Sequence, residues 1–435
     1  MSRDWILVKH YFDHAFVVLR RSSLLTALII LAIGLGIGAC MTMVTVLHVM
    51  SGDPLPDRSA KLFYPHLYPG PWDFQQLDPG SNFTWPDATN LLRAHRATHQ
   101  AAMVGGHLAV MPAEGSKSFF AAGHYVSAEF FPMFNAPFAA GSFWDTQADQ
   151  DQALVVVLNG ELARRLFGNA QAAVGQTVRL HSLDFRVVGV LQDWHPEPLF
   201  YGGLSGDWAF KSEDGFFVPL NTAMSRKLPV SGGEMCWGKG DRMSDQCSWL
   251  QFWVELDTPE QVVAYQSFLA SYWLDQKAHG RPVLNIAPQL LGMMRRLDAL
   301  RLVPPNVSLQ LWLALGFLCV CLFNTVSLML AKFLRRSGEV SIRRAMGASR
   351  RDIFLQFGIE AAVLGLIGGA LGLISTWFGL WLVHQRPDAY AKLAYLDTTM
   401  VLSTILLAVI ASTLAGLLPA WRACRIPPAA QLHAA

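Results

Sequence analysis

The sequence predicts a membrane protein with four transmembrane α-helices, grouped as one plus three, and a large α+β domain between helices one and two. Composition is the first observation: of 435 residues, 52% are hydrophobic and only 15% are charged, a balance unusual for a soluble enzyme. The second is that Asp, Glu, Lys and Arg are absent from residues 22–52, 302–331, 361–385 and 398–421. A helix needs about 20 apolar residues to cross a bilayer core, and helices satisfy their own backbone hydrogen bonds in lipid. Each stretch therefore predicts one spanning helix.

The distribution of basic residues predicts the orientation of these helices. We place the helices at residues 24–48, 308–331, 349–384 and 399–421. Lys and Arg are concentrated before the first helix and between helices two and three, whereas the connection between helices three and four has only Arg386 and Lys392. Because positively charged loops stay on the cytoplasmic side, both termini are predicted to be cytoplasmic and residues 49–305 to face outside.

The two ends of the chain are predicted to lie at the cytoplasmic face. Residues 1–23 form an amphipathic interfacial helix, because one helical face collects the apolar side chains of Trp5, Val8, Phe12, Ala15 and Leu19. A cleaved signal ending in "IGAC" at residues 37–40 is the alternative, but the apolar run continues past Cys40, unlike the short core of a signal peptide. Residues 422–435 are a cytoplasmic tail.

The outer domain, residues 49–305, is long enough to have its own core. Residues 153–169 read as a buried strand followed by a helix that Gly168 ends, and residues 177–193 as a hairpin. A helix is predicted to start at Thr258 and to run to about Lys277. The Gly-, Pro- and Trp-rich residues 196–248 predict irregular structure.

Two of the six cysteines, Cys236 and Cys247, belong to the outer domain. In an oxidising compartment two cysteines this close in sequence could form a disulfide. Two free thiols remain the alternative at this point.

The sequence shows no catalytic or metal-binding motif. Neither H-E-x-x-H nor G-x-S-x-G occurs, and no Cys/His cluster has zinc spacing. "GEMCWGKG" at residues 233–240 imitates a phosphate-binding loop, but Gly240 replaces the Ser or Thr that would hold magnesium. We therefore expect no enzyme activity, no catalytic residue and no metal. The net charge of +2 gives no reason to expect a nucleic-acid partner.

The spanning helices contain glycines at spacings that favour close helix packing. Gly34 and Gly38 are four residues apart on helix one. Helix three contains two such pairs: Gly365 with Gly369, and Gly368 with Gly372. No charged residue lies in the middle of a span, which argues against a proton- or ion-coupled transporter. Glu360, near the inner end of helix three, is expected to pair with an arginine.

The connection between helices two and three, residues 335–351, is here called the arginine loop. Residues 338–354 read "GEVSIRRAMGASRRDIF", and residues 337–348 are predicted to form a short helix that Gly347 ends in a left-handed turn. Ser349 and Asp352 have the spacing of a capping box at the start of helix three. The loop could simply bind lipid headgroups, or its rigid helix could pass force from a cytoplasmic partner to the membrane.

The stretch "GEVSIRRAMGASRRDIFLQFGIEAAVLGLIGGALG", residues 338–372, resembles the signature of the MacB/FtsX-type permeases of ABC transporters. "YVSAEFFPMF" at residues 125–134 and "VVVLNGELARRLFG" at residues 155–168 resemble the family's periplasmic core domain, and the ending "LPAWRACRIPPAAQLHAA" resembles its C-terminal pattern. Val340 and Ser341 depart mildly from the usual coupling sequence, and the excursion that contains Cys236 and Cys247 looks like an insertion.

The resemblance implies a coupling helix that contacts an ATPase. The implied ATPase-facing residues are Glu339, Ile342, Arg343, Arg344, Ala345, Gly347 and Ala348. ATP and magnesium would be bound by a separate cytoplasmic ABC ATPase subunit, because the chain has only 23 residues before helix one and no true Walker motif. Further implied partners are a second permease, alike or different, the lipid bilayer, and in export systems a periplasmic adaptor with an outer-membrane channel.

The implied function is that of a permease subunit in a bacterial inner membrane, which uses ATP hydrolysis to move its periplasmic domain and export a substrate by mechanotransmission. Two alternatives share the same mechanics. One is an FtsX-like regulatory scaffold that activates a periplasmic hydrolase, and the other is a permease that extracts lipoproteins.

Overall fold

The computed structural model describes residues 23–67, 83–112, 117–202, 209–210, 214–281, 286–336, 349–386 and 389–425, together with residues 338, 342, 346 and 347. The chain divides into two compact units. One unit, Met50–Val303, is here called the outer domain, and Met1–Val49 with Pro304–Ala435 is called the helix unit. The interfacial helix predicted for residues 1–23 lies outside the described residues except at its last position, which belongs to the first helix described.

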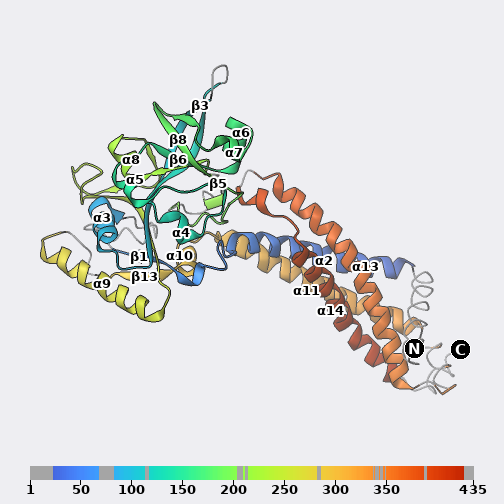
Figure 1. Cartoon of the computed structure of the whole chain (residues 1–435). Helices are drawn as coiled ribbons and strands as arrows, with labels where there is room; N and C mark the ends of the chain where they lie inside the picture. Colours follow the sequence, from blue (N-terminus) through green and yellow to red (C-terminus); the bar gives the residue numbers. More distant parts are fainter. Residues whose placement is uncertain are drawn as a thin grey trace. The chain divides into compact units, whose positions relative to one another are not determined.

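In its described residues, the helix unit contains four long helices that pack together (Figure 1). They are α2 (Ser23–Ser51), α11 (Pro305–Arg335), α13 (Arg350–His384) and α14 (Thr398–Arg425). Each is long and apolar enough to cross a membrane, which confirms the one-plus-three prediction. The end of the bundle where α11 stops and α13 starts is here called the loop end. A 3-10 turn, η4 (Ala389–Leu393), lies between α13 and α14 at the opposite end.

The helix ends follow from local sequence. Pro305 occupies the first turn of α11, where its missing N–H leaves no hydrogen bond unmade. The structure extends α11 to Arg335, four residues past the predicted end, and α14 to Arg425, so the first four residues of the predicted tail are helical. Residues 426–435 of the predicted tail lie outside the described part of the chain.

The outer domain is built around one sheet in which the strands follow the order β13-β1-β12-β3-β4-β9-β6-β8-β5. The strands along this order are β13 (Gln289–Gly292), β1 (Leu62–His66), β12 (Cys247–Glu255), β3 (His99–Met111), β4 (Phe119–Val126), β9 (Phe216–Pro219), β6 (Val155–Leu158), β8 (Leu183–Leu191) and β5 (Phe138–Gly141). Four short strands pair beside this path: β2 (Phe83–Thr84), β7 (Thr177–Leu180), β10 (Val230–Ser231) and β11 (Met235–Cys236). Most neighbours are antiparallel, and β4–β9 and β6–β8 are parallel.

Short helices surround the sheet (Figure 1). They are α3 (Trp85–Ala94), α4 (Phe130–Phe134), α5 (Thr146–Gln150), α6 (Gly160–Phe167), α7 (Ala170–Ala173), α8 (Leu220–Ser225), α9 (Pro259–Ala278), α10 (Met293–Ala299) and the 3-10 turn η1 (Ser59–Lys61). All nine residues of β12 are buried, the pattern of a strand with both faces covered. Large aromatic side chains, among them Phe130, Phe134 and Trp253, fill the core.

The chain enters and leaves the outer domain through neighbouring strands. β1 follows α2 in sequence, while β13 and α10 precede α11. The two strands pair antiparallel, with Phe63 opposite Gly292 and His66 opposite Gln289. The strands next to the chain's two connections with the spanning helices are therefore hydrogen-bonded to each other.

Most of the local predictions for the outer domain are confirmed. β6 runs into α6, which Gly168 ends at φ +87°. β7 and β8 form the predicted hairpin, and α9 starts after its Thr258 cap and ends at Ala278. The prediction of irregular structure over residues 196–248 is wrong in part, because β9, α8, β10 and β11 lie there. The short apolar run at residues 216–219 forms a buried inner strand, which its Gly- and Pro-rich surroundings concealed.

Candidate functional site

Within the arginine loop, the residues described before α13 are Arg335, Arg336, Gly338, Ile342, Met346, Gly347 and Ser349. Gly338 and Ile342 have helical backbone, and the N–H of Met346 donates to the carbonyl oxygen of Ile342 at 3.0 Å, as in an α-helix. The side chains of Ile342 and Met346 are 63% and 75% exposed. Two apolar residues four positions apart are therefore mostly exposed, an arrangement suited to contact with a partner.

The end of the loop is joined to α13 by well-defined backbone structure. Gly347 has φ +103°, a conformation that glycine adopts without strain. Ser349 then caps α13: its hydroxyl accepts the N–H of Asp352 at 3.2 Å, and the N–H of Ser349 donates to the Asp352 carboxylate at 3.1 Å. The predicted left-handed turn and the predicted capping box are both confirmed. Only a few residues therefore separate Gly347 from the start of the 35-residue helix α13.

Five of the implied ATPase-facing residues, Glu339, Arg343, Arg344, Ala345 and Ala348, lie outside the described residues. Ile342 and Gly347 are described and lie in the same short segment as them. The coupling helix predicted over residues 337–348 is therefore seen only at Gly338, Ile342, Met346 and Gly347.

A cluster of charged side chains is buried at the loop end of the helix unit. Lys332 and Glu360 are 1% and 2% exposed. Nζ of Lys332 lies 2.7 Å from Oε1 of Glu360, and Nη1 of Arg336 lies 2.9 Å from Oε2. Lys332 Nζ also donates to Oγ1 of Thr26 at 3.3 Å. The cluster therefore connects α2, α11 and α13, and the expected pairing of Glu360 with an arginine is confirmed.

The predicted packing glycines lie at contacts between helices. A Cβ atom on Gly34 or Gly38 of α2 would lie within 3 Å of Leu371 or Ser375 of α13. Gly368 and Gly372 of α13 face Ile33 and Ile37 of α2 in return. The other pair of α13 faces α14: Gly365 lies against Ser412, and Gly369 against Ala408. α13 thus offers one glycine face to α2 and another to α14, which allows close approach on both sides.

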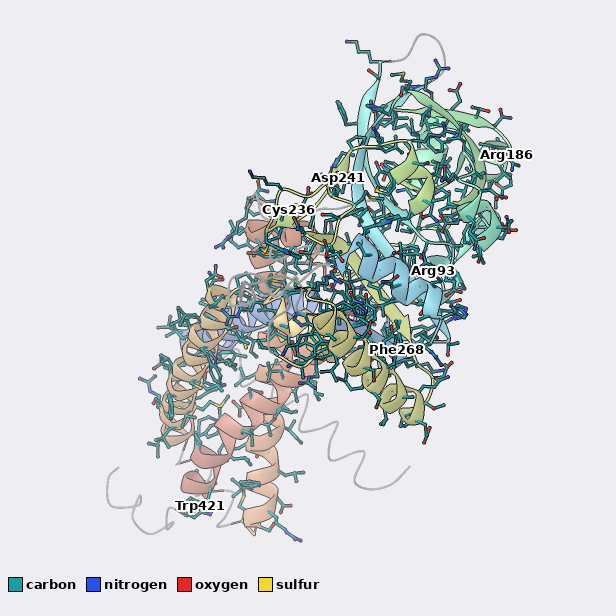
Figure 2. The ribbon with its side chains drawn as sticks, turned by 90° about the vertical axis from the view of Figure 1, so that its left-hand side faces the viewer. Arg93, Arg186, Cys236, Asp241, Phe268 and Trp421 are labelled. Atoms are coloured by element: carbon teal, nitrogen blue, oxygen red, sulfur yellow. A yellow bond between two sulfur atoms is a disulfide. The ribbon has the colours of Figure 1, made fainter. Side chains whose placement is uncertain are left out.

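Cys236 and Cys247 are joined by a disulfide, with the sulfur atoms 2.01 Å apart. The two residues are direct partners on β11 and β12, and Figure 2 labels Cys236 with nearby Asp241. A carboxylate oxygen of Glu234 lies within 4.8 Å of both sulfurs, but the sulfurs are bonded to each other and Glu234 pairs with Arg242 at 2.6 Å. These donor atoms are therefore already paired. The two cysteines link the residues around them covalently rather than forming a metal centre with Glu234.

Two buried polar groups in the outer domain were not predicted. Asp87 of α3 pairs with Arg281, just after α9, and both side chains are almost fully buried. In the second group, Nδ1 of His124 lies 2.8 Å from Asp214, and the hydroxyl of Tyr201 donates to the same carboxylate at 2.7 Å. Burial, followed by the charge of Asp214, raises the pKa of Tyr201. The phenol therefore stays protonated and fixes the chain before β9 to β4.

Lys332 is one of the basic residues concentrated between helices two and three, and the structure shows that its side chain is buried. Its helical phase carried the signal: Thr325, Met329 and Lys332 follow the i, i+4, i+7 spacing of one helix face, and all three are buried. Asp87 and Arg281 had no comparable signal, because 194 residues separate them.

Comparison with known proteins identifies both units. Residues 26–270 match the MacB-like periplasmic core domain family, and residues 312–428 match the FtsX-like permease C-terminal family. A pyoverdine export ATP-binding/permease protein of Pseudomonas syringae is 26% identical over 308 residues, which are 69% of this chain and 41% of that protein. The macrolide export ATP-binding/permease protein MacB of Nitrobacter winogradskyi is 28% identical over 302 residues, 69% of this chain and 42% of that protein.

The chain thus spans less than half the length of these relatives. Among solved structures, the periplasmic region of MacB from Actinobacillus actinomycetemcomitans is 16% identical with a TM-score of 0.37, covering 55% of this chain and 92% of that one. The core-domain family alone accounts for more than half of the residues. With four candidate spans around that domain, the chain belongs to the MacB/FtsX-type permeases of ABC transporters.

Proposed function

We propose that this permease is driven by a separate cytoplasmic ABC ATPase that docks on the arginine loop, and that ATP hydrolysis moves the periplasmic domain to export a substrate by mechanotransmission. The observation that carries the proposal is the connection between loop and bundle. The loop ends in a left-handed glycine and a capping box, and α13 starts at the next residue. A displacement of the loop would therefore move a helix about 52 Å long, at about 1.5 Å per residue.

The distribution of charge supports mechanical transmission over conduction through the bundle. In the four helices, Asp, Glu, Lys and Arg occur only at residues 332–335, 350–360 and 422–425, all toward the loop end. A charged or strongly polar path across a membrane needs polar side chains along its length. In the described parts of the helices, the residues at those levels are uncharged: glycines, apolar side chains, and buried threonines and serines. The hydroxyls of Thr325 and Thr404, for example, donate to carbonyl oxygens of their own helices.

The relatives support export over the alternative functions. Both are named as export ATP-binding/permease proteins, one for pyoverdine and one for macrolides. Their cargoes differ, so we propose export without naming a substrate. In this assignment the loop end is cytoplasmic, and ATP and magnesium are bound by the ATPase. A second permease completes the assembly, and a periplasmic adaptor with an outer-membrane channel would receive the substrate.

Charge reversal of the loop tests the proposal. We expect Arg343→Glu/Arg344→Glu to abolish co-purification of the ATPase in mild detergent while the permease is inserted in normal amounts, because the docking surface loses its positive charge. Arg386→Glu/Lys392→Glu, at the other end of the bundle, is the matched control and should keep the ATPase. Mass spectrometry of the purified wild-type complex identifies the subunit to be followed. Undiminished association of the loop variant would contradict the proposal.

A further inference from the structure

The buried charges of the helix unit connect the three helices that matter most for transmission. Glu360 lies on α13, the helix that continues from the arginine loop. Lys332 lies on α11 and Arg336 directly after it, while Thr26 lies on α2. α2 and α11 are the two helices that continue into the outer domain. We call Thr26, Lys332, Arg336 and Glu360 the ionic clasp.

The clasp also closes the base of the arginine loop. Arg336 is the first residue after α11, and Glu360 lies eleven residues into α13. Their contact at 2.9 Å bridges the two stems between which the loop is suspended. Phe333 and Phe357 stack beside it with ring centroids 4.1 Å apart, so aromatic packing and ion pairs meet at one level of the bundle.

The clasp differs physically from the glycine contacts along the rest of the helices. Contacts among glycine, alanine and isoleucine residues depend on close fit and carry no charge. Charge-assisted contacts depend on distance and angle. Since Lys332 and Glu360 are almost fully buried, breaking their contact would leave charges in apolar surroundings. The clasp therefore favours one axial register of α11 against α13, at the level where Phe333 and Phe357 also stack.

We propose that the ionic clasp holds α11, α13 and α2 in register and passes a displacement of the arginine loop to the two helices that carry the outer domain. Lys332, Arg336 and Glu360 act as positioning residues and contact neither ATP nor cargo. The proposal rests on the proposed function for the source of the displacement. The register that the clasp sets is a property of the permease alone.

Neutral variants separate transmission from charge balance. Lys332→Met and Glu360→Gln each leave one buried charge with fewer partners, and each should lower the thermal stability of the permease. The double variant Lys332→Met/Glu360→Gln removes the two charges that are almost fully buried and leaves Arg336, whose side chain is 15% exposed, beside a neutral amide. It should regain stability without regaining register. Thr325→Val is the matched control, because that buried hydroxyl donates to the carbonyl oxygen of Cys321 on its own helix.

Register is read by disulfide crosslinking in the full-length permease, with the membrane cysteines replaced and pairs introduced at Phe333→Cys/Phe357→Cys and, one turn away, at Phe333→Cys/Ile353→Cys and Phe333→Cys/Ala361→Cys. In the double variant we expect the ratio of in-register to shifted crosslinks to fall about tenfold, the change that a loss of about 1.4 kcal/mol in preference produces. The control should keep the wild-type ratio. An unchanged ratio in the double variant would overturn the proposal.

Transmission is read in the complex with the co-purified ATPase, by the ATP-dependent change in distance between spin labels on the outer domains of the two permeases. The double variant should bind the ATPase normally and lose most of this change, while Thr325→Val keeps it. If the double variant showed the same ATP-dependent distance change as wild type, the clasp would serve only to neutralise buried charge, and the proposal would be wrong. If wild type itself shows no ATPase binding, the proposed function fails, whereas the crosslinking result still decides whether the clasp sets the register.

Discussion

In the outer domain, Asp87 and Arg281 form a buried ion pair, and in the helix unit Lys332 and Arg336 share the buried carboxylate of Glu360. Hydroxyl groups complete the first site: Thr84 and Tyr272 each donate to the Asp87 carboxylate at 2.7 Å. Arg281 contacts both carboxylate oxygens. The second site joins two cations to one anion, with one threonine hydroxyl nearby.

The difference shows how buried charge can serve two purposes. The Asp87 site ties the first turn of α3 to the chain after α9, and its many donors make it rigid. The ionic clasp has fewer fixed donors and lies where a loop joins a long helix. A fully satisfied cluster fixes a fold, whereas a few strong contacts between separate helices act on the register of those helices.

The largest expected effect comes from the outer-domain pair. Asp87→Ala leaves Arg281 buried beside the Tyr272 hydroxyl without its carboxylate, and should lower the unfolding free energy of the outer domain by about 3–5 kcal/mol. Tryptophan fluorescence during thermal or denaturant unfolding of the full chain in detergent measures it. Asp184→Ala breaks the exposed pair with Arg179 and should leave the transition unchanged. Equal shifts for both variants would remove the distinction drawn above.

The next effect tests what holds the helices together. A Cβ atom on Gly38 would lie 2.3 Å from Cβ of Ser375, so Gly38→Val must push α2 from α13 and should destabilise the helix unit by about 3 kcal/mol. Gly316→Val, where no atom lies within 4 Å, is the matched control. Thermal stability and the monodisperse fraction in detergent report the result. If Gly38→Val were milder than the neutral clasp variant, charge rather than close packing would dominate the stability of the bundle.

A smaller effect concerns pH, at a third buried site. Burial, helped by the nearby charge of Arg296, lowers the pKa of His66 on β1 to about 3. The unfolded chain takes up this proton near pH 6.5 and the native domain does not, so stability is complete above pH 6.5 and is lost as the pH falls toward 3. At pH 5 the loss is about 2 kcal/mol. His66→Gln should remove this part of the acid sensitivity.

The measurement is the difference in outer-domain melting temperature between pH 7 and pH 5, compared between wild type and His66→Gln. Asp149 affects stability in the opposite direction. Burial raises its pKa to about 6, so the native domain holds this proton more tightly than the unfolded chain does, and the domain loses stability as the pH rises toward 6. Both proteins share Asp149, so it cancels in the comparison. An identical pH response of the two proteins would exclude His66 as a source.

Much of the site could be predicted from sequence because its signals are local. Gly347 predicts where the short helix of the arginine loop stops, and the capping box of Ser349 and Asp352 predicts where α13 starts. Both signals lie within six residues, and the structure has both. The glycine spacings indicated faces but not their partners. That Gly368 and Gly372 meet α2 while Gly365 and Gly369 meet α14 depends on how the helices are arranged.

The sequence by itself determined the four spans, the position of the large domain between the first two, and the glycine turn and helix cap of the arginine loop. It could do so because hydropathy, glycine conformation and capping act over a few residues. Only the tertiary structure decided which charges are buried together. Lys332 meets Glu360 across 28 residues and Thr26 across 306, and Asp87 meets Arg281 across 194. The spacing of residues along the sequence carries no information about such pairs, because the energy of a buried charge depends on what the whole fold places beside it.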